Sequence, residues 1–275
     1  MSAPRRVLFV LRGKLGDTLL RYSAVRAYAD ANPSDDVTLL VRAAYAPLVA
    51  GERGIRVIGF SSRLAMMLRL AWMRWTEPVF DALAVLLGAG PPIERIGRMV
   101  RARRRIYLDG RFANVFPEWP EIRRDHLLFE PAWSVARMID PALPFPTRLR
   151  IPGLEARRSR DNAAIGIVPI SDEARRTFGV EATRALCRHV ATIYPGREIR
   201  ILVNRNDREA AAQVAAGPAS GTVFRHFSDV ASLLAELSGL EHLYATDTGL
   251  YHVAIAMGLP TTVLFGPTQP WKNGF

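Results

Sequence analysis

The sequence predicts an α/β fold with two Rossmann-like domains that face a cleft. Short apolar, β-branched runs alternate with helical patterns of about ten to fifteen residues, which is typical of parallel sheets covered by helices on both faces. The length of 275 residues is enough for one large or two modest domains. A proline-rich stretch at 141–152 divides the alternation into two halves, residues 1–150 and 151–275.

The first half begins with an apolar strand at 6–11, which leads through Arg12-Gly13-Lys14-Leu15-Gly16-Asp17 into a helix. The elements expected in this half are, in order, strand 6–11, helix 17–31, strand 37–41, helix 44–50, strand 55–59, an apolar helix at 61–75, strand 80–87 and a basic helix at 93–105. Ligands of such sheets bind beyond the carboxyl ends of the strands, so the loops that follow strands are the candidate sites.

The second half repeats the alternation more clearly. The elements expected here are strand 164–168, a polar loop at 171–179, helix 181–194, strand 199–203, helix 207–216, strand 222–224, helix 229–238, strand 242–246, a short helix after Gly249 and strand 261–265. The same rule places its candidate site in the loops after 164–168 and 242–246.

The most informative segment is Thr246–Thr268, which together with the apolar run Leu243–Ala245 before it predicts a strand, a polar turn, a helix and a second strand. Free backbone N–H groups and the helix dipole favour a phosphate at such a turn, and Gly249 lets the backbone approach closely. An ordinary capped turn is the alternative. Asp247, Thr248 and His252 crowd this one turn, however, and offer a ligand both donors and acceptors.

The loop after the first strand carries Gly13, Lys14, Gly16 and Asp17. It matches neither the Walker A pattern nor G-x-G-x-x-G, so the glycines alone identify no nucleotide site. Asp17 has two interpretations. It is either a structural residue that caps the helix, or a catalytic base that points into the cleft.

No D-x-D triplet and no His/Cys cluster with zinc spacing occurs, so no metal site is expected. Phosphate charge would then be met by helix N-termini and arginines. Arg175 and Arg176 in the polar loop are candidates, with a solvated pair as the alternative. The absence of G-x-S-x-G argues against a serine hydrolase.

The net charge of +11 is concentrated in the first half. Residues 1–150 contain 24 Lys and Arg against 14 Asp and Glu, whereas residues 151–275 contain 13 against 12. A basic half suggests an anionic partner such as lipid headgroups, a phosphorylated glycan or nucleic acid. Arginine-rich coding bias is the alternative, since only two of the 37 basic residues are lysines. No aromatic residues interleave with the arginines at 101–105, which argues against a nucleic-acid surface.

The helix expected at 61–75 combines leucines, methionines and tryptophans with Arg63, Arg69 and Arg74. Such a helix lies either in a membrane interface or in the core with its arginines reaching solvent. The single cysteine, Cys187, fits a reducing cytoplasm. We expect a cytoplasmic protein, because no secretory signal and no long uncharged apolar run is present.

Together these motifs resemble glycosyltransferase family 9, the ADP-heptose:lipopolysaccharide heptosyltransferases. The first anchor is Gly16-Asp17-Thr18 after the N-terminal strand. The second is Arg176-Thr177-Phe178-Gly179, which stands where the family has Lys-x-Trp-Pro. The third is Asp247-Thr248-Gly249-Leu250-Tyr251-His252 with its Gly-Leu-Pro and Phe-Gly-Pro-Thr sequel. In order and spacing, the resemblance covers nearly the whole chain.

The resemblance implies a GT-B fold and an inverting, metal-independent transfer of a sugar from a nucleotide sugar. The sugar would be a heptose from ADP-heptose, and the acceptor a lipopolysaccharide core or related anionic glycan. Asp17 would be the catalytic base, and Asp207 is an alternative to Glu209 as the ribose ligand. The donor site would comprise Lys14, Arg176, Glu209, Asp247, Thr248, Gly249 and His252.

The same resemblance assigns the donor to the second domain and the acceptor to the first. Arg63, Arg69 and Arg74 would contact an anionic glycolipid, with peripheral contact to the cytoplasmic face of the inner membrane. No cofactor and no nucleic-acid partner is expected. A catalytically silent nucleotide-binding or scaffold protein with the same fold is the alternative, since the second motif is degenerate. A basic nucleic-acid binder is a third reading, which charge alone supports.

Overall fold

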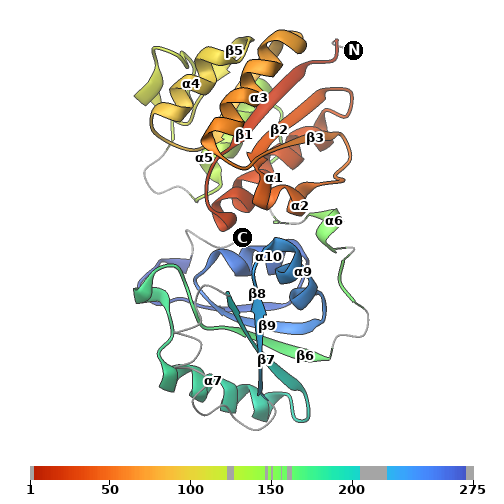
Figure 1. The fold of residues 1–275 in the computed structure, drawn as a ribbon, viewed down its shortest axis with the longest axis vertical. Helices are drawn as coiled ribbons and strands as arrows, with labels where there is room; N and C mark the ends of the chain where they lie inside the picture. The colour runs from red at the N-terminus through yellow and green to blue at the C-terminus, as the bar shows by residue number, and fades with distance from the viewer. Residues whose placement is uncertain are drawn as a thin grey trace. The chain divides into compact units, whose positions relative to one another are not determined.

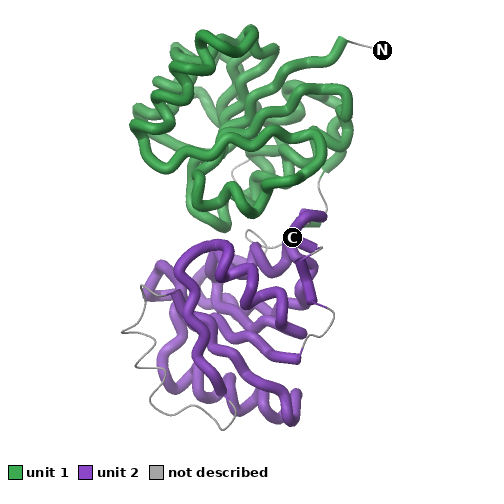
Figure 2. The backbone as a smooth tube through the Cα atoms, turned by 45° about the vertical axis from the view of Figure 1, so that its right-hand side comes forward, with its two compact units in different colours: residues 1–149, 271–275 green, residues 150–270 purple. Residues whose placement is uncertain are grey.

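The computed structural model describes residues 3–122, 127–145, 148–149, 151–155, 157–159, 163–204 and 222–270. The chain forms two compact units, residues 1–149 with 271–275, and residues 150–270 (Figure 2). Each unit has a five-stranded sheet in which the paired strands are parallel. The expected α/β class with two Rossmann-like units is therefore confirmed.

The first unit has its strands in the order β3-β2-β1-β4-β5. Its elements are β1 (Arg6–Leu11), α1 (Leu15–Ala31), β2 (Asp36–Arg42), the 3-10 turn η1 (Ala43–Tyr45), α2 (Ala46–Val49), β3 (Ile55–Phe60), α3 (Arg63–Thr76), β4 (Phe80–Leu87), α4 (Pro91–Met99), β5 (Ala102–Ile106), the 3-10 turn η2 (Gly110–Phe112) and α5 (Glu130–Ile139). The winding reverses direction between β1 and β4, which makes that point of the sheet the expected ligand position.

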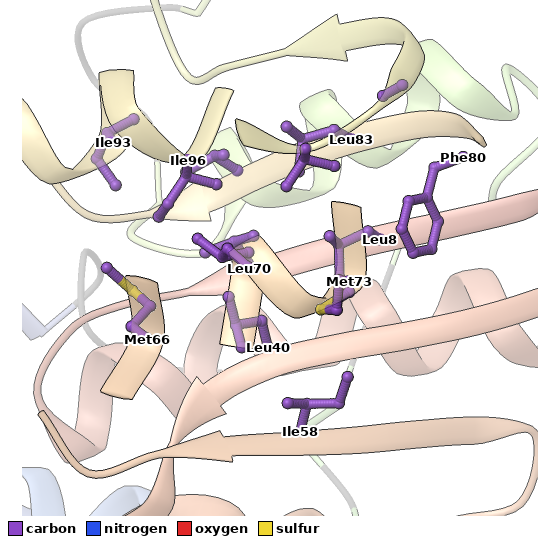
Figure 3. Close-up of a cluster of buried hydrophobic side chains, with 14 of the residues drawn as sticks. Leu8, Leu40, Ile58, Met66, Leu70, Met73, Phe80, Leu83, Ile93 and Ile96 are labelled. Carbon is purple, nitrogen blue, oxygen red and sulfur yellow. The ribbon is translucent and has the colours of Figure 1, made fainter. Parts of the chain in front are cut away.

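Helices cover both faces of this sheet (Figure 1). Strand β1 is buried on both sides, as its continuous apolar sequence predicts. Figure 3 shows α3 and α4 over one face, where Met66, Leu70 and Ile96 pack with Leu8 and other strand residues. On the opposite face, Phe9 meets Tyr28 of α1, and α5 packs against α1.

One expected helix of the first unit is wrong. The span 93–105 is not one basic helix, because α4 ends at Met99 and residues 102–106 form β5 at the edge of the sheet. Ala102 and Ile106 face inward, while Arg103 between them is exposed. The arginine-rich sequence of β5 hides this alternation. Helix α5 was not expected from the sequence at all.

The second unit has the strand order β10-β9-β6-β7-β8, with the same reversal between β6 and β9. Its elements are α6 (Pro152–Glu155), β6 (Ala164–Val168), the 3-10 turn η3 (Ala174–Arg176), α7 (Val180–Ile193), β7 (Glu198–Asn204), β8 (Thr222–Phe227), α9 (Val230–Ser238), β9 (Leu240–Thr246), α10 (Gly249–Ala256) and β10 (Thr261–Leu264). The helix expected at 207–216 lies outside the described residues.

Two glycines shape the second unit. A Cβ on Gly166 in β6 would lie 2.5 Å from Leu240 Cδ1, so a larger residue there would have to displace that side chain. Gly258 follows the end of α10 with φ of 68°, a left-handed conformation that ends the helix.

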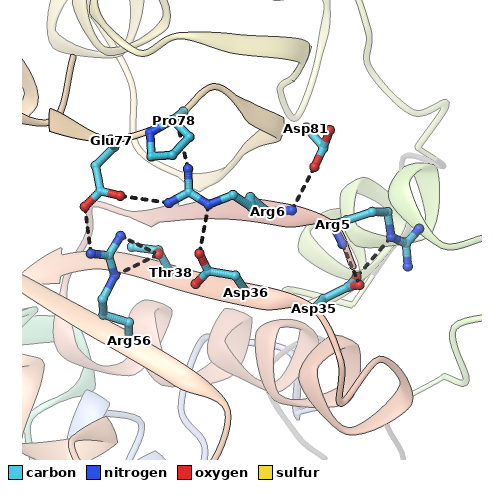
Figure 4. A network of polar contacts seen from close by, with 9 residues as sticks. All are labelled: Arg5, Arg6, Asp35, Asp36, Thr38, Arg56, Glu77, Pro78 and Asp81. Carbon is cyan, nitrogen blue, oxygen red and sulfur yellow. Dashed lines mark hydrogen bonds and ion pairs between the residues drawn. The ribbon is translucent and has the colours of Figure 1, made fainter. Parts of the chain in front are cut away.

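A network of ion pairs holds the amino ends of the first unit's strands (Figure 4). Arg6 Nε lies 2.9 Å from Asp36 Oδ2, and Arg6 Nη2 lies 2.8 Å from Glu77 Oε2. Arg56 Nη1 contacts the other Glu77 oxygen at 2.7 Å. Asp81 accepts a hydrogen bond from the backbone N–H of Arg6. The positive charges of Arg6 and Arg56 are therefore matched by carboxylates within the unit.

Replacing Glu77 tests this network. Hydrogen bonds from Arg56 and Arg6 hold the pKa of Glu77 below its ordinary value. Its stabilisation is therefore present above the ordinary glutamate pKa and is lost as pH falls through the lowered pKa. We expect Glu77→Gln to lower the free energy of unfolding by about 1–2 kcal/mol at neutral pH, measured by urea denaturation.

The matched control is Arg103→Gln, which breaks an exposed ion pair with Asp81 on the same sheet. We expect that variant to change the free energy of unfolding by less than about 0.5 kcal/mol. Equal losses in the two variants would contradict the role assigned to Glu77.

Candidate functional site

The junction between β9 and α10 places two polar residues inside the second unit. Asp247 is 3% exposed, and Thr248 beside it is also buried. Thr248 occupies the N-cap position with extended backbone, yet its hydroxyl makes no capping hydrogen bond. The first N–H groups of a helix lack partners within the helix and favour negative charge. The predicted turn is thus a helix start suited to an anion.

Asp247 joins three loops that follow strands. Its Oδ2 accepts a hydrogen bond from Thr268 Oγ1 at 2.6 Å and lies 3.3 Å from Arg176 Nη1. Ser171 Oγ donates to the Asp247 carbonyl at 3.0 Å, and the Thr246 hydroxyl donates to the carbonyl of Arg176. The loops after β6, β9 and β10 therefore meet at one buried carboxylate, at the reversal point of the sheet.

Arg176 is only partly satisfied by these contacts. Besides Asp247, its guanidinium meets Glu173 Oε1 at 3.0 Å. Its Nε is buried and has no hydrogen-bond partner within the described part of the chain. A buried donor without a partner is uncommon in folded proteins and marks a place for a ligand or water. The structure thus brings the motif that begins at Arg176 into contact with the motif that begins at Asp247.

His252 is buried inside α10, with its ring centroid 3.9 Å from that of Tyr251. Burial lowers the pKa of His252 to about 3, so the folded protein holds this imidazole neutral at ordinary pH. The structure gives His252 a packing role, and its contact with a donor stays a prediction. Glu209 and Asp207 lie outside the described residues.

In the first unit, Asp17 lies in the first turn of α1, beyond the carboxyl end of β1. Its Oδ1 accepts a hydrogen bond from Arg21 Nη1 at 2.8 Å. The Asp17 side chain is 39% exposed, and Oδ2 accepts no hydrogen bond from the described residues. The ion pair with Arg21 holds one oxygen of this partly exposed carboxylate in place.

The loop before Asp17 is shaped by a close approach. A Cβ on Gly13 would lie 2.2 Å from Leu87 Cδ2, and the Arg12 N–H donates to the Leu87 carbonyl at 2.9 Å. Gly13 therefore lets the loop pack against the end of β4. Lys14 occupies the N-cap position of α1, and its carbonyl accepts a hydrogen bond from Thr18 Oγ1.

A second helix begins at the same point of the sheet. Gly88 and Gly90, with φ of 135° and 77°, form the turn from β4 into α4. The Tyr107 hydroxyl donates to the Gly88 carbonyl at 2.7 Å and holds the turn. The N-termini of α1 and α4 thus follow the two strands between which the sheet reverses, a placement that favours an anionic ligand.

Three arginines gather at this carboxyl edge. Arg12 follows β1, Arg42 ends β2, and Arg63 begins α3 after β3. The pKa of Arg12 is lowered by partial burial and by the charges of Arg42 and Arg63. Among the described residues, none of the three pairs with a carboxylate. Of these three, the sequence analysis named only Arg63 as a candidate acceptor-binding residue. Arg12 and Arg42 could have been found from their positions, because one follows a strand and the other ends one.

The other two predicted acceptor arginines have contacts within the first unit. The Arg69 guanidinium lies 5.4 Å from the ring centroid of Trp72. Arg74 donates to the carbonyls of Arg98 and Met99, where it caps the end of α4. Contacts of Arg63, Arg69 and Arg74 with an acceptor stay predictions.

The described ranges contain neither a metal-centre cluster nor a helix suited to span a membrane. No three His, Cys, Asp or Glu side chains gather there as a metal centre requires. No helix in the same ranges has both the length and the apolar character needed to cross a bilayer.

Comparison with known proteins supports the predicted resemblance. No protein-family model matches the chain. A stretch of 68 residues is 41% identical to lipopolysaccharide heptosyltransferase 1 of Pseudomonas aeruginosa. That match covers 25% of this chain and only 19% of the relative's length.

Solved structures match over nearly the whole chain. The E. coli heptosyltransferase WaaC with ADP has a TM-score of 0.81 at 18% identity, covering 98% of this chain and 90% of that chain. A glycosyl transferase family 9 structure from Veillonella parvula has a TM-score of 0.81 at 15% identity, covering 100% of this chain and 85% of that chain. E. coli ADP-heptose lps heptosyltransferase II has a TM-score of 0.74 at 16% identity, covering 96% of this chain and 86% of that chain.

The two parallel-sheet units and these neighbours define the fold as GT-B. More particularly, it is the fold of the heptosyltransferases of glycosyltransferase family 9. The resemblance inferred from the sequence motifs is confirmed at the level of the fold.

The buried His252 predicts a pH dependence of stability. Between its lowered pKa of about 3 and the ordinary value of 6.5, the unfolded chain binds a proton that the folded chain does not. Stability therefore falls as pH falls through this window. From about pH 6 to pH 5, the wild type should lose about 1 kcal/mol more unfolding free energy than His252→Asn.

Urea denaturation at both pH values measures this difference. His189→Asn, which removes an exposed histidine of α7, is the control and should follow the wild type. Parallel pH profiles for the wild type and His252→Asn would show that burial does not keep this imidazole neutral.

Proposed function

We propose that the protein is an inverting, metal-independent glycosyltransferase that moves a heptose from ADP-heptose to a lipopolysaccharide-core or related anionic glycan. The observation that carries this proposal is the junction of Asp247, Arg176 and Thr268 at the start of α10. A similar protein, E. coli WaaC, has been solved with ADP and with ADP-2-deoxy-2-fluoro heptose.

The donor diphosphate is assigned to the start of α10. The Thr248 hydroxyl and the Gly249 N–H would donate to its oxygens, and the dipole of α10 favours its charge. Arg176, held by Asp247 and Glu173, adds a charge-assisted hydrogen bond. Asp247 holds Arg176 and the loops in place. It is also the candidate to accept hydrogen bonds from the sugar hydroxyls. Lys14, Glu209 and His252 remain further donor candidates.

Asp17 is assigned as the catalytic base. As the acceptor hydroxyl oxygen attacks the anomeric carbon, Asp17 Oδ2 takes its proton, and the bond from that carbon to the diphosphate oxygen breaks. Attack opposite the leaving group inverts the configuration. The leaving diphosphate keeps its electron pair and is stabilised by α10 and Arg176. Arg21 acts as a positioning residue through its ion pair with Asp17.

The acceptor is assigned to the carboxyl edge of the first sheet, where Arg12, Arg42 and Arg63 gather. Three neighbouring guanidinium groups that pair with no carboxylate of the described residues repel one another and are stabilised by an anion. This favours a phosphorylated or acidic glycan over a neutral one. A peripheral position on the cytoplasmic face of the inner membrane fits such a glycolipid acceptor.

Replacing Asp17 tests the proposed chemistry. We expect Asp17→Asn to lower kcat for heptose transfer by about 100-fold or more, because the amide cannot accept the proton. The dissociation constant for ADP-heptose should stay within about twofold of the wild type. Release of ADP in the presence of a phosphorylated core acceptor measures turnover, and calorimetry measures donor binding.

The matched control is Asp30→Asn, which breaks the equivalent i,i+4 ion pair with Arg26 on the same helix. It should keep wild-type turnover. Wild-type turnover in Asp17→Asn would remove Asp17 from the mechanism, and a wild-type protein that binds ADP-heptose without transferring it would favour the silent scaffold.

Replacing Arg42 tests the acceptor assignment. We expect Arg42→Gln to raise KM for the anionic acceptor by about tenfold while the donor KM is unchanged. The acceptor KM of the variant should also depend less on salt than that of the wild type. Arg103→Gln, at the amino edge, is the control for a general loss of positive charge. Equal effects on donor and acceptor, or equal effects of both variants, would contradict the assignment.

A further inference from the structure

Helix α3 carries a row of exposed apolar side chains. Leu64, Leu68, Trp72 and Trp75 are 68%, 63%, 51% and 84% exposed. Their spacing of four, four and three residues places them on one face of the helix. Large apolar side chains scattered singly on a surface need no explanation, but four in one row mark an interaction surface.

This row is separate from the face of α3 that holds the fold together. Met66, Leu70 and Met73 point into the core of the first unit, where they pack over Leu8 and Leu40 (Figure 3). The core contacts of α3 therefore do not use the exposed row. The helix is apolar on two faces, and the described residues cover only one of them.

The surroundings of the row are basic. No Asp or Glu occurs from Val57 to Thr76, whereas Arg63 and Arg69 are both exposed on α3. The guanidinium of Arg69 lies over the ring of Trp72, which keeps a cation next to the apolar row. At the start of the helix, Arg63 adds its charge to those of Arg12 and Arg42.

We propose that α3 binds the surface of an anionic lipid bilayer. Tryptophan and leucine side chains on one face, flanked by arginines, are the composition of helices that lie in the plane of a membrane interface. The four apolar residues would enter the boundary between headgroups and acyl chains, and Arg63 and Arg69 would contact lipid phosphates. The net charge of +10 over residues 1–150 favours an anionic bilayer over a protein partner.

This inference deepens the proposed function and rests on its peripheral membrane position, but neither the donor site nor Asp17 enters it. If membrane binding fails while heptose transfer is observed, only the lipid surface is excluded. If transfer fails while binding to vesicles is observed, only the enzymatic proposal is excluded.

Vesicle sedimentation of the full chain tests the proposal. We expect the wild type to bind vesicles of phosphatidylcholine mixed with phosphatidylglycerol, and to bind phosphatidylcholine alone at least about tenfold more weakly. The double variant Trp72→Ser/Trp75→Ser should lower the partition coefficient on the mixed vesicles by about tenfold or more. The control Ile193→Ser, at an exposed apolar residue of α7, should bind like the wild type.

A second pair of measurements does not depend on the folding of the tryptophan variant. Arg63→Gln/Arg69→Gln should weaken binding to the mixed vesicles and reduce its salt dependence. Brominated lipids should quench the fluorescence of the wild type, and Trp75→Phe should lose part of that quenching.

Two results would overturn the proposal. One is a wild type that does not bind the mixed vesicles. The other is a Trp72→Ser/Trp75→Ser protein of wild-type thermal stability that binds them as well as the wild type.

Discussion

The ion pair between the buried carboxylate of Asp247 and Arg176 is the interaction on which the candidate donor site depends. A carboxylate at 3% exposure is costly unless it is paired and hydrogen-bonded, and Arg176 and Thr268 supply both. Satisfying this one group fixes the loops after β6, β9 and β10 relative to the start of α10. The arrangement also fixes a guanidinium whose Nε has no hydrogen-bond partner among the described residues. In the proposed function, this buried charge pair positions the donors for a diphosphate.

The two ends of the first sheet use the same residue type in opposite ways. At the amino edge, Arg6 and Arg56 are matched by Asp36 and Glu77, so these arginines contribute to stability. The cluster at the carboxyl edge, which contains Arg12, Arg42 and Arg63, has no such carboxylates among the described residues. A high arginine content therefore does not by itself identify a binding surface. The partners of each arginine separate a structural role from a binding role.

Much of the fold could be predicted from the sequence, because central parallel strands are continuous apolar runs. Strand β4 begins and ends with the apolar residues Phe80 and Leu87, and β1 is apolar from Val7 to Leu11. Strand β5 could not be predicted, since three consecutive arginines at an edge conceal its alternation. Asp247 and Asp17 were predicted as candidate site residues from local motifs. Arg12 and Arg42 were not, because only the strand order brings residues this far apart in sequence to one edge.

Hydrogen exchange of the full chain with and without ADP-heptose tests the central claim, that the start of α10 and the loop after β6 form the donor site. Saturating ADP-heptose should slow exchange of the amides at 247–251 and 171–178, with peptides of α9 as the unaffected reference. The corresponding UDP- and GDP-sugars should protect these amides less. Unchanged exchange in both segments under saturating ADP-heptose, or protection confined to the first unit, would contradict the account.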